Sequence, residues 1–167
     1  MAAHPNGADQ TVVRMRENAS HVPEAVERFL DSTLESVDSA EELAVGVAQR
    51  AGLDEEDLMK VGMAVRESMV NAVVHGNRYN ARKKVHLKVS RAPDRLTVWV
   101  ADEGDGFDPA SLPDPLAGEN LLRQSGRGVL MMQAFMDEFQ ICNRAPQGTE
   151  VKMVKYVART SQEGGFQ

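Results

Sequence analysis

The sequence predicts an α+β fold: a two-layer sandwich whose mixed, mostly antiparallel sheet carries its helices on one face. Three observations predict this class. Residues 54–79 place apolar side chains at helical spacing, residues 84–91 and 95–102 alternate as strands do, and residues 138–143 and 149–158 form a second strand pair. Short turns between consecutive strands favour antiparallel pairing, and the apolar side of each helix then has to pack on the sheet.

Each element is predicted from a local pattern. The first helix is predicted by apolar residues at helical spacing, namely Val26, Phe29, Leu30 and Leu34. Gly52 is suited to end the second helix and Asp54 to cap the third. The expected elements are a strand at 11–16, helices at 22–36, 40–51 and 54–79, strands at 84–91 and 95–102, a short helix from residue 127, and strands at 138–143 and 149–158.

Length and composition favour one domain, because the chain has 167 residues and 42% of them are hydrophobic. We expect a disordered segment at 1–10, the folded domain at 11–158 and a flexible tail at 159–167. The single cysteine, Cys142, excludes an internal disulfide and is expected to be a packed thiol. A net charge of −6 argues against nucleic-acid binding, and no apolar run is long enough for a membrane span, so a cytoplasmic protein is expected.

One face of the third helix carries polar side chains where burial is expected. At about 100° per residue, Glu67, Asn71, His75 and Arg78 fall within roughly 80° of one another. Apolar neighbours flank this face closely, which suits the wall of a cavity better than a freely solvated surface. The alternative is an ordinary exposed carboxylate, with Glu67 paired to Arg66, Arg78 or another base.

A second group of residues follows the predicted strand at 95–102. Asp102 shares the face of Leu96, Val98 and Val100 by two-residue alternation, so its carboxylate is expected to point inward. Gly104 and Gly106 would let the backbone turn tightly and approach a ligand. An ordinary strand ending in an Asp-Gly turn is the alternative.

A third group begins at Gly126 and Gly128, which precede the helix-like run 129–136. Free amide groups at a helix start attract phosphate oxygens. The preceding segment has three prolines and a glycine within residues 109–118, which suits a mobile lid. A glycine-flanked loop is the alternative, and Leu130, Met131, Phe135 and Met136 are expected to pack in the core.

Together these segments, ESMVNAVVHGN, DEGDGFDP and SGRGVLMMQAFMDE, resemble the Bergerat-fold ATPases. Within that superfamily they look closest to the anti-sigma-factor serine/threonine-protein kinases of bacterial partner switching. The resemblance covers roughly residues 11–158. It implies a sandwich fold, ATP and Mg²⁺ as cofactors, a sigma factor and an anti-sigma antagonist as partners, and a homodimer.

The resemblance also implies roles for individual residues. Glu67 would be the general base, Asn71 would bind the magnesium ion, and Asp102 would accept a hydrogen bond from the adenine amino group. The remaining implied contacts are Gly104 and Gly106 near the base and sugar, Gly126, Arg127 and Gly128 at the phosphates, and Thr149 at the adenine.

The expected function is therefore phosphoryl transfer from ATP to a serine of the antagonist, combined with sequestration of a sigma factor. Two alternatives remain at this stage: a non-catalytic ATP-binding switch, and a partner-binding module that leaves the glycine loops empty. The presence of both Glu67 and Asn71 favours the enzyme, because a pure binding module needs no base.

Overall fold

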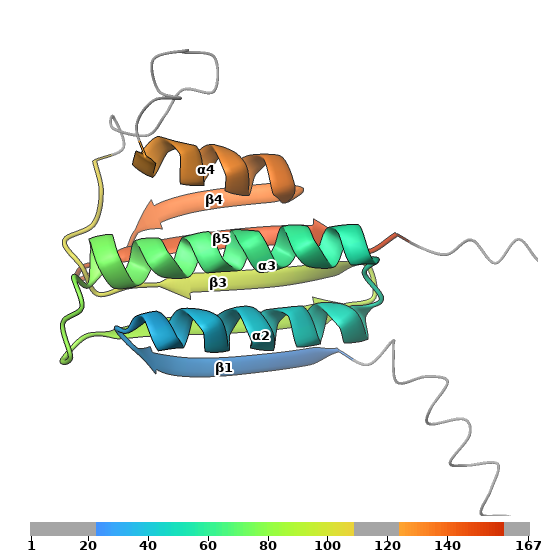
Figure 1. Cartoon of the computed structure of the whole chain (residues 1–167), viewed down its shortest axis with the longest axis horizontal. Coiled ribbons are helices and arrows are strands. Elements are labelled where there is room, and N and C mark those ends of the chain that lie inside the picture. Colours follow the sequence, from blue (N-terminus) through green and yellow to red (C-terminus); the bar gives the residue numbers. More distant parts are fainter. Residues whose placement is uncertain (1–22, 109–123, 159–167) are drawn as a thin grey trace, which may run out of the picture.

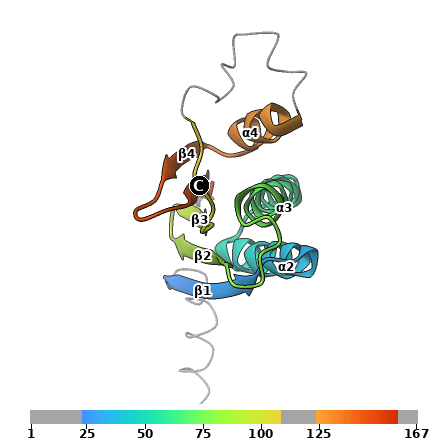
Figure 2. The same ribbon diagram turned by 90° about the vertical axis from the view of Figure 1, so that its left-hand side faces the viewer.

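The structure, a computed structural model, describes residues 23–108 and 124–158. The five strands of this part form one sheet in the order β1-β2-β3-β5-β4, and each pairing between them is antiparallel. Three helices lie along one face of the sheet, as Figures 1 and 2 show from two sides. The predicted fold class is confirmed. The strands are β1 (Glu24–Asp31), β2 (Lys84–Ala92), β3 (Arg95–Ala101), β4 (Glu138–Asn143) and β5 (Thr149–Tyr156), and the helices are α2 (Leu34–Ala51), α3 (Glu55–Val70) and α4 (Gln124–Phe135).

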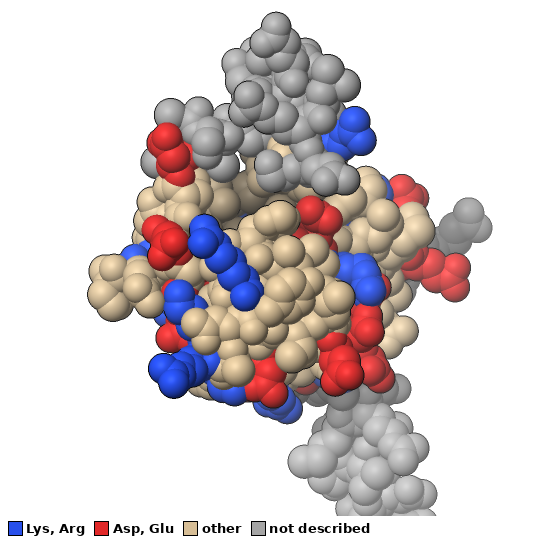
Figure 3. Space-filling view, turned by 60° about the vertical axis from the view of Figure 1, so that its left-hand side comes forward, with Lys and Arg blue, Asp and Glu red and all other residues tan. Residues whose placement is uncertain are grey.

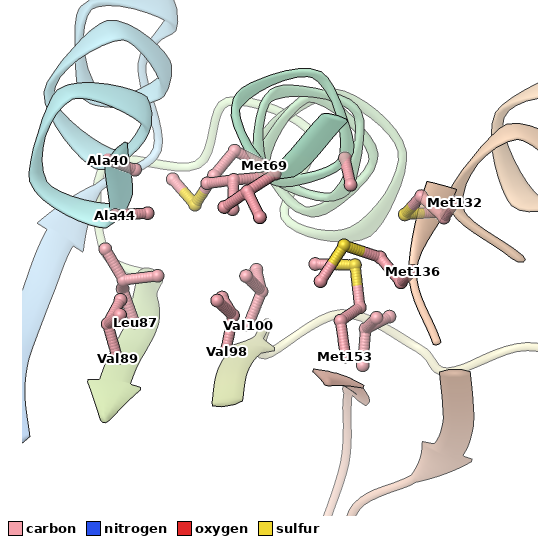
Figure 4. Close-up of a cluster of buried hydrophobic side chains, with 14 of the residues drawn as sticks. Ala40, Ala44, Met69, Leu87, Val89, Val98, Val100, Met132, Met136 and Met153 are labelled. Carbon is pink, nitrogen blue, oxygen red and sulfur yellow. The ribbon is translucent and has the colours of Figure 1, made fainter. Parts of the chain in front are cut away.

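The core fills the space between the two layers (Figure 4). Alternate residues of β2 and β3 form the sheet side of the core, because every second side chain of a strand points toward the helices. The helices supply small residues from α2 and methionines from α3 and α4. Its labelled members in the figure are Ala40, Ala44, Met69, Leu87, Val89, Val98, Val100, Met132, Met136 and Met153, all buried.

The expected helix at 22–36 is wrong. Residues 24–31 form strand β1, which pairs with β2 from Glu24 to Asp31, and α2 begins at Leu34 rather than at residue 40. Val26 and Leu30 are four residues apart, a spacing that places two side chains on one face of a strand as well as of a helix. Both pack against the core, whereas Phe29 lies on the opposite face, 69% exposed and stacked on His86.

Helix α3 begins where the sequence predicts. The carboxylate of Asp54 accepts a hydrogen bond from the amide of Asp57 at 2.8 Å, which satisfies one free donor of the first turn. After Val70 the helix widens into a π-helical segment, Asn71–Gly76, and two residues of positive φ follow, Arg78 at 51° and Tyr79 at 57°. Since π-helical turns are frequent at functional sites, this change of period is a structural sign of a site.

Helix α4 is fastened at its C-terminal end. The buried Lys155 of β5 donates a hydrogen bond to the carbonyl of Phe135 at 2.9 Å. The same ammonium group lies 3.4 Å from a carboxylate oxygen of Asp57 and 3.8 Å from one of Asp137. One cation therefore holds together the start of α3, the end of α4 and strand β5.

Three expectations about this C-terminal part need correction. Helix α4 begins at Gln124, so Gly126 and Gly128 lie inside it rather than before it. Met136 is buried as expected, but Leu130, Met131 and Phe135 are only half-buried, and Val129 and Met132 take the core positions. Cys142 is exposed, because β4 is an edge strand and Ile141, not Cys142, is the neighbour that packs on the core.

Several expectations fall outside the described residues. These are the disordered segment at 1–10, the strand at 11–16, the tail at 159–167 and the lid at 109–118.

Candidate functional site

One pocket opens between the end of α3, the helix α4 and strands β3, β4 and β5. The pocket is open at its mouth and has a cavity volume of about 160 Å³. The lining is mostly apolar, with a few polar groups. Its residues are Ser68, Asn71, Ala72, His75, Gly76, Val100, Asp102, Gly106, Phe107, Val129, Met132, Ile141, Thr149 and Val151.

Asp102 is the buried acid of this pocket, with 6% of its surface exposed. The inward direction predicted from strand alternation is confirmed. Its Oδ1 accepts hydrogen bonds from the amides of Gly104 at 2.9 Å and Thr149 at 3.1 Å. Burial raises the pKa of this carboxyl above its ordinary value, and the two amide hydrogen bonds oppose that rise. With Oδ1 occupied by the backbone, Oδ2 is the oxygen that remains for a ligand donor.

The loop after β3 lies against the π-helical segment through two glycines. A Cβ on Gly104 would lie 2.4 Å from the carbonyl oxygen of Gly76, and a Cβ on Gly76 would lie 2.4 Å from Oδ2 of Asp102. A side chain on Gly104 would force the two backbones apart, whereas one on Gly76 would displace the carboxylate of Asp102. Asn143 of β4 then holds the loop further along, accepting from the amide of Phe107 at 2.9 Å and donating to its carbonyl at 3.0 Å.

Asn77 joins three segments directly behind the pocket. Its amide nitrogen donates to Ser32 Oγ at 2.9 Å and to the carbonyl of Lys84 at 3.0 Å, and its Oδ1 accepts from the amide of Glu103 at 2.8 Å. Ser32 in turn donates to the carbonyl of Lys83 at 2.6 Å. The buried side chain of Asn77 therefore fixes the position of Asp102 relative to the end of α3.

Glu67 lies beside the pocket, not in its lining. Its half-buried carboxylate makes no hydrogen bond or ion pair with the described residues. Arg66 pairs instead with Asp38 at 2.8 Å and Glu41 at 2.6 Å, and Arg78 lies 3.9 Å from Asp105. The alternative of an ordinary surface ion pair is thus wrong for Glu67 in this part of the chain.

Helix α4 approaches Glu67 closely at Gly128. A Cβ on Gly128 would lie only 2.0 Å from Oε1 of Glu67, so the glycine leaves the space that this carboxylate occupies. Val129, the next residue, lines the pocket. Glu67 therefore lies beside the part of α4 that lines the pocket, whereas Asp102 belongs to the lining itself.

Only some of the predicted site residues line the pocket. Asn71, Asp102, Gly106 and Thr149 line the pocket, Gly104 packs behind it, and Glu67 and Gly128 touch one another at its side. The buried Gly126 and the exposed Arg127 lie on α4 outside the lining. Arg78 lies away from the lining because it follows the π-helical segment, where the helical spacing used to place it no longer holds.

Sequence patterns missed several lining residues. Gly76 and Ser68 come from the same helix as Glu67 and Asn71, but neither stands out by residue type. Val129, Met132, Ile141 and Val151 look like ordinary core residues in the sequence. A pocket wall of this kind depends on how separate elements pack together, which no local pattern contains.

The described residues contain no group of three or more His, Cys, Asp or Glu side chains placed to hold a metal ion. Nor do any of their helices have the length and apolar character needed to cross a membrane.

Figure 3 shows Lys and Arg side chains mixed with Asp and Glu side chains around a broad uncharged area of the surface.

Comparison with known proteins adds the family. Residues 30–155 match the family described as the histidine kinase-like ATPase domain. The chain belongs to this family. The expected membership of the Bergerat-fold ATPases is thereby confirmed. Relatives of this chain include serine-protein kinases and an anti-sigma factor.

The serine-protein kinase RsbW of Bacillus subtilis is 33% identical over 67% of this chain and 72% of its own length. The serine-protein kinase RsbW of Staphylococcus epidermidis is 28% identical over 80% of this chain and 87% of its own. The anti-sigma F factor of Bacillus thuringiensis is 30% identical over 64% of this chain and 74% of its own. These relatives confirm the expected class of protein, an ATP-dependent serine kinase of the anti-sigma type.

A solved structure agrees on the fold. The RsbU and RsbW domains of Rv1364c from Mycobacterium tuberculosis match 79% of this chain with a TM-score of 0.58 and 19% identity. The match covers only 31% of that solved chain. At this identity the match shows that the sandwich fold is shared.

Proposed function

We propose that this protein binds Mg²⁺-ATP, transfers the γ-phosphoryl group to a serine of an anti-sigma antagonist, and sequesters a sigma factor when the antagonist does not oppose it. Family membership supports the reaction class. The observation that carries the proposal is the pocket itself, in which a buried carboxylate and an amide lie on one side and an unpaired glutamate lies at the edge. The same kinship supports a homodimer.

Asp102 would recognise the base. Its Oδ2 would accept a hydrogen bond from the exocyclic amino group of adenine, while Oδ1 stays bonded to the amides of Gly104 and Thr149. Guanine presents an acceptor at the equivalent position, and two facing acceptors repel. A site built around one such hydrogen bond discriminates strongly against a base that cannot make it.

Asn71 fits the role of a magnesium ligand. It lines the pocket half-buried, one helical turn from Glu67, and its side chain makes no hydrogen bond with the described residues. Mg²⁺ prefers oxygen ligands and is held in many kinases by one or two side chains together with substrate phosphates and water, which agrees with a site that has one amide and no carboxylate cluster. When bound, the ion would neutralise phosphate charge.

Glu67 would act as the general base. Its carboxylate would take the proton of the serine hydroxyl as that oxygen bonds to the γ-phosphorus, and the bond from this phosphorus to the bridging oxygen of ADP would break. A carboxylate without a competing ion pair is available for this work, since Arg66 pairs elsewhere. Gly126, Arg127 and Gly128 on α4 are proposed to face the phosphates.

The Glu67→Gln variant tests this assignment. It keeps the shape of the side chain and removes the base, so nucleotide affinity should be unchanged while serine phosphorylation falls by about 10² to 10⁴-fold. The assay uses the full chain, labelled ATP and a candidate antagonist, with affinity measured by calorimetry.

Two outcomes would contradict the proposal in different ways. Undiminished transfer by the Glu67→Gln variant means that another group is the base. Nucleotide binding without transfer by the unchanged protein, across antagonists that it binds, identifies a non-catalytic switch instead.

A further inference from the structure

A groove runs along the solvent side of the helix layer, between α2 and α3, which lie side by side over the sheet (Figure 1). It has a cavity volume of about 310 Å³ and shares no residue with the pocket of the candidate site. Its lining combines apolar side chains with two carboxylates and contains no basic residue. The lining residues are Glu41, Val45, Gln49, Glu55, Leu58, Met59, Gly62 and Met63.

The apolar part of the groove is centred on Gly62. A Cβ on this glycine would lie 3.3 Å from a methyl group of Val45 and 3.4 Å from the carboxylate of Glu41, so the missing side chain leaves room there. Met59 and Met63 flank the glycine on α3 and are 58% and 42% exposed. Grouped exposed apolar side chains mark a binding surface, and methionine suits one because its unbranched side chain adapts to the segment packed on it.

The two carboxylates of the groove indicate the charge of its occupant. Glu41 contacts Arg66 at 2.6 Å, and the nearby Asp38 contacts the same guanidinium at 2.8 Å, so two carboxylates share one cation. Glu55 is exposed and makes no hydrogen bond or ion pair with the described residues. An occupant that combines apolar side chains with positive charge would therefore complement the groove.

A segment of this composition precedes the described part of the chain, which begins at residue 23. Residues 11–16, TVVRMR, contain three apolar side chains, two arginines and no acidic residue. Glu24, the first residue of β1, pairs with Arg50 at 2.8 Å, beside Gln49 at one end of the groove. Residues 17–22 can span up to about 20 Å, whereas α2 rises only about 12 Å from Glu41 to Gln49. Residues 11–16 are therefore within reach of the groove.

We propose that residues 11–16 of this chain occupy the groove between α2 and α3. Their apolar side chains cover Met59 and Met63, and their two arginines meet Glu41 and Glu55. Because the segment is tethered, its effective concentration at the groove is in the millimolar range, so a weak intrinsic affinity is sufficient. The inference goes beyond the proposed function, since it concerns the outer surface of the helix layer and assigns no contact to the nucleotide.

Oxidation of methionine by hydrogen peroxide, read by mass spectrometry on the full chain, measures access to Met59 and Met63 directly. The Val12→Asp/Val13→Asp variant should be oxidised at both positions about four- to tenfold faster than the unchanged protein. This factor follows if an effective concentration of about 1 mM acts on a Kd of about 0.1–0.3 mM. Met69, which is fully buried, should stay protected in both proteins and so shows that the variant is folded.

A second variant tests the charge of the segment. Arg14→Glu/Arg16→Glu should also speed the oxidation of Met59 and Met63, because it brings carboxylates against the carboxylates of the groove. Asn18→Glu is the matched control: it adds a negative charge to the connecting residues 17–22 and should leave both rates unchanged.

Three outcomes would overturn the inference. The first is an equal oxidation rate of Met59 and Met63 in the unchanged protein and in the Val12→Asp/Val13→Asp variant. The second is an effect of Asn18→Glu as large as that of Arg14→Glu/Arg16→Glu. The third is protection that grows with protein concentration, which would mean that a second copy covers the groove. ATP affinity should be the same in all these proteins, so the test is independent of the proposed function.

Discussion

Asp102 combines a cost in stability with a proposed role in selecting the base. Its carboxylate is held in a buried position by two backbone amides, and burial still raises its pKa from the ordinary value of 3.8. Since the folded protein then binds the proton more tightly than the unfolded chain, stability is lost as pH rises from 3.8 through the raised pKa. The charge that would recognise adenine is therefore kept against a cost in stability.

The Asp102→Asn variant should separate these two properties. Its amide oxygen can keep both backbone hydrogen bonds, while an NH₂ group replaces the acceptor Oδ2, so ATP affinity should fall at least about tenfold. Thermal unfolding without ligand should show the variant at least as stable as the unchanged protein at neutral pH, with the difference shrinking toward pH 3.8.

The pH series provides the control, because both proteins carry an uncharged group at this position in acid. A variant that is equally destabilised at every pH would contradict the assigned cost of burial. Tight ATP binding by the variant would contradict the role of Asp102 in recognition.

At the scale of elements, the contact between α3 and α4 decides where the proposed base lies. Gly128 leaves just enough space for Glu67, and the obstacle that a larger residue would meet is the end of a side chain, not backbone. Such a side chain can move aside cheaply. A substitution here should therefore displace Glu67 while leaving the fold intact.

The Gly128→Ala variant should keep its melting temperature within a few degrees, since alanine also favours the helix. Phosphoryl transfer should fall by about 10²-fold, because a displacement of about 1 Å at a reacting group costs this much. Gly46→Ala is the matched control: it lies on a helix and its Cβ would meet only Arg50 at 3.5 Å, so activity should not change. Full transfer by Gly128→Ala would show that this contact does not position the base.

The elements differ in how far the sequence predicts them, for a physical reason. Helix α3 has a cap at Asp54 and a regular apolar face, and β2 and β3 alternate clearly, so local patterns are sufficient there. Strand β1 was predicted as a helix because Val26 and Leu30 satisfy both periods, and only its eight-residue pairing with β2 decides between them. That pairing joins residues about sixty positions apart, beyond the reach of a local pattern.

For the whole molecule, Asn77 is the residue that joins the layers behind the pocket. Its three hydrogen bonds connect the end of β1, the start of β2 and the loop after β3. Asn77→Ala should destabilise the protein by about 2–4 kcal/mol, because the Lys84 carbonyl and the Glu103 amide lose their partner. Chemical unfolding measures this loss.

Asn80→Ala is the appropriate comparison, since Asn80 is exposed and its side chain accepts only from the amide of Arg82. It should change stability by no more than about 0.5 kcal/mol. If both variants lost the same free energy of unfolding, the buried hydrogen bonds of Asn77 would contribute no more than the exposed one of Asn80.

As with the fold, local sequence patterns predict part of the candidate site, and contacts between distant segments determine the rest. The sequence indicates Glu67, Asn71 and Asp102, because polar groups on otherwise apolar faces stand out locally. It does not indicate Ser68, Gly76 or Asn143, whose importance arises only when α3, the loop after β3 and β4 come together. Residue types reveal the chemistry of a site, whereas its walls are products of packing.

The fastening of α4 at one end has a mechanical consequence. Lys155 holds α4 at Phe135. At 1.5 Å per residue, Gly128 lies about 10 Å from this attachment along the helix axis. A tilt of about 10° would swing Gly128 by about 2 Å, enough to open or close its gap to Glu67. A displacement of the Gln124 end would thus change the position of Gly128 relative to Glu67.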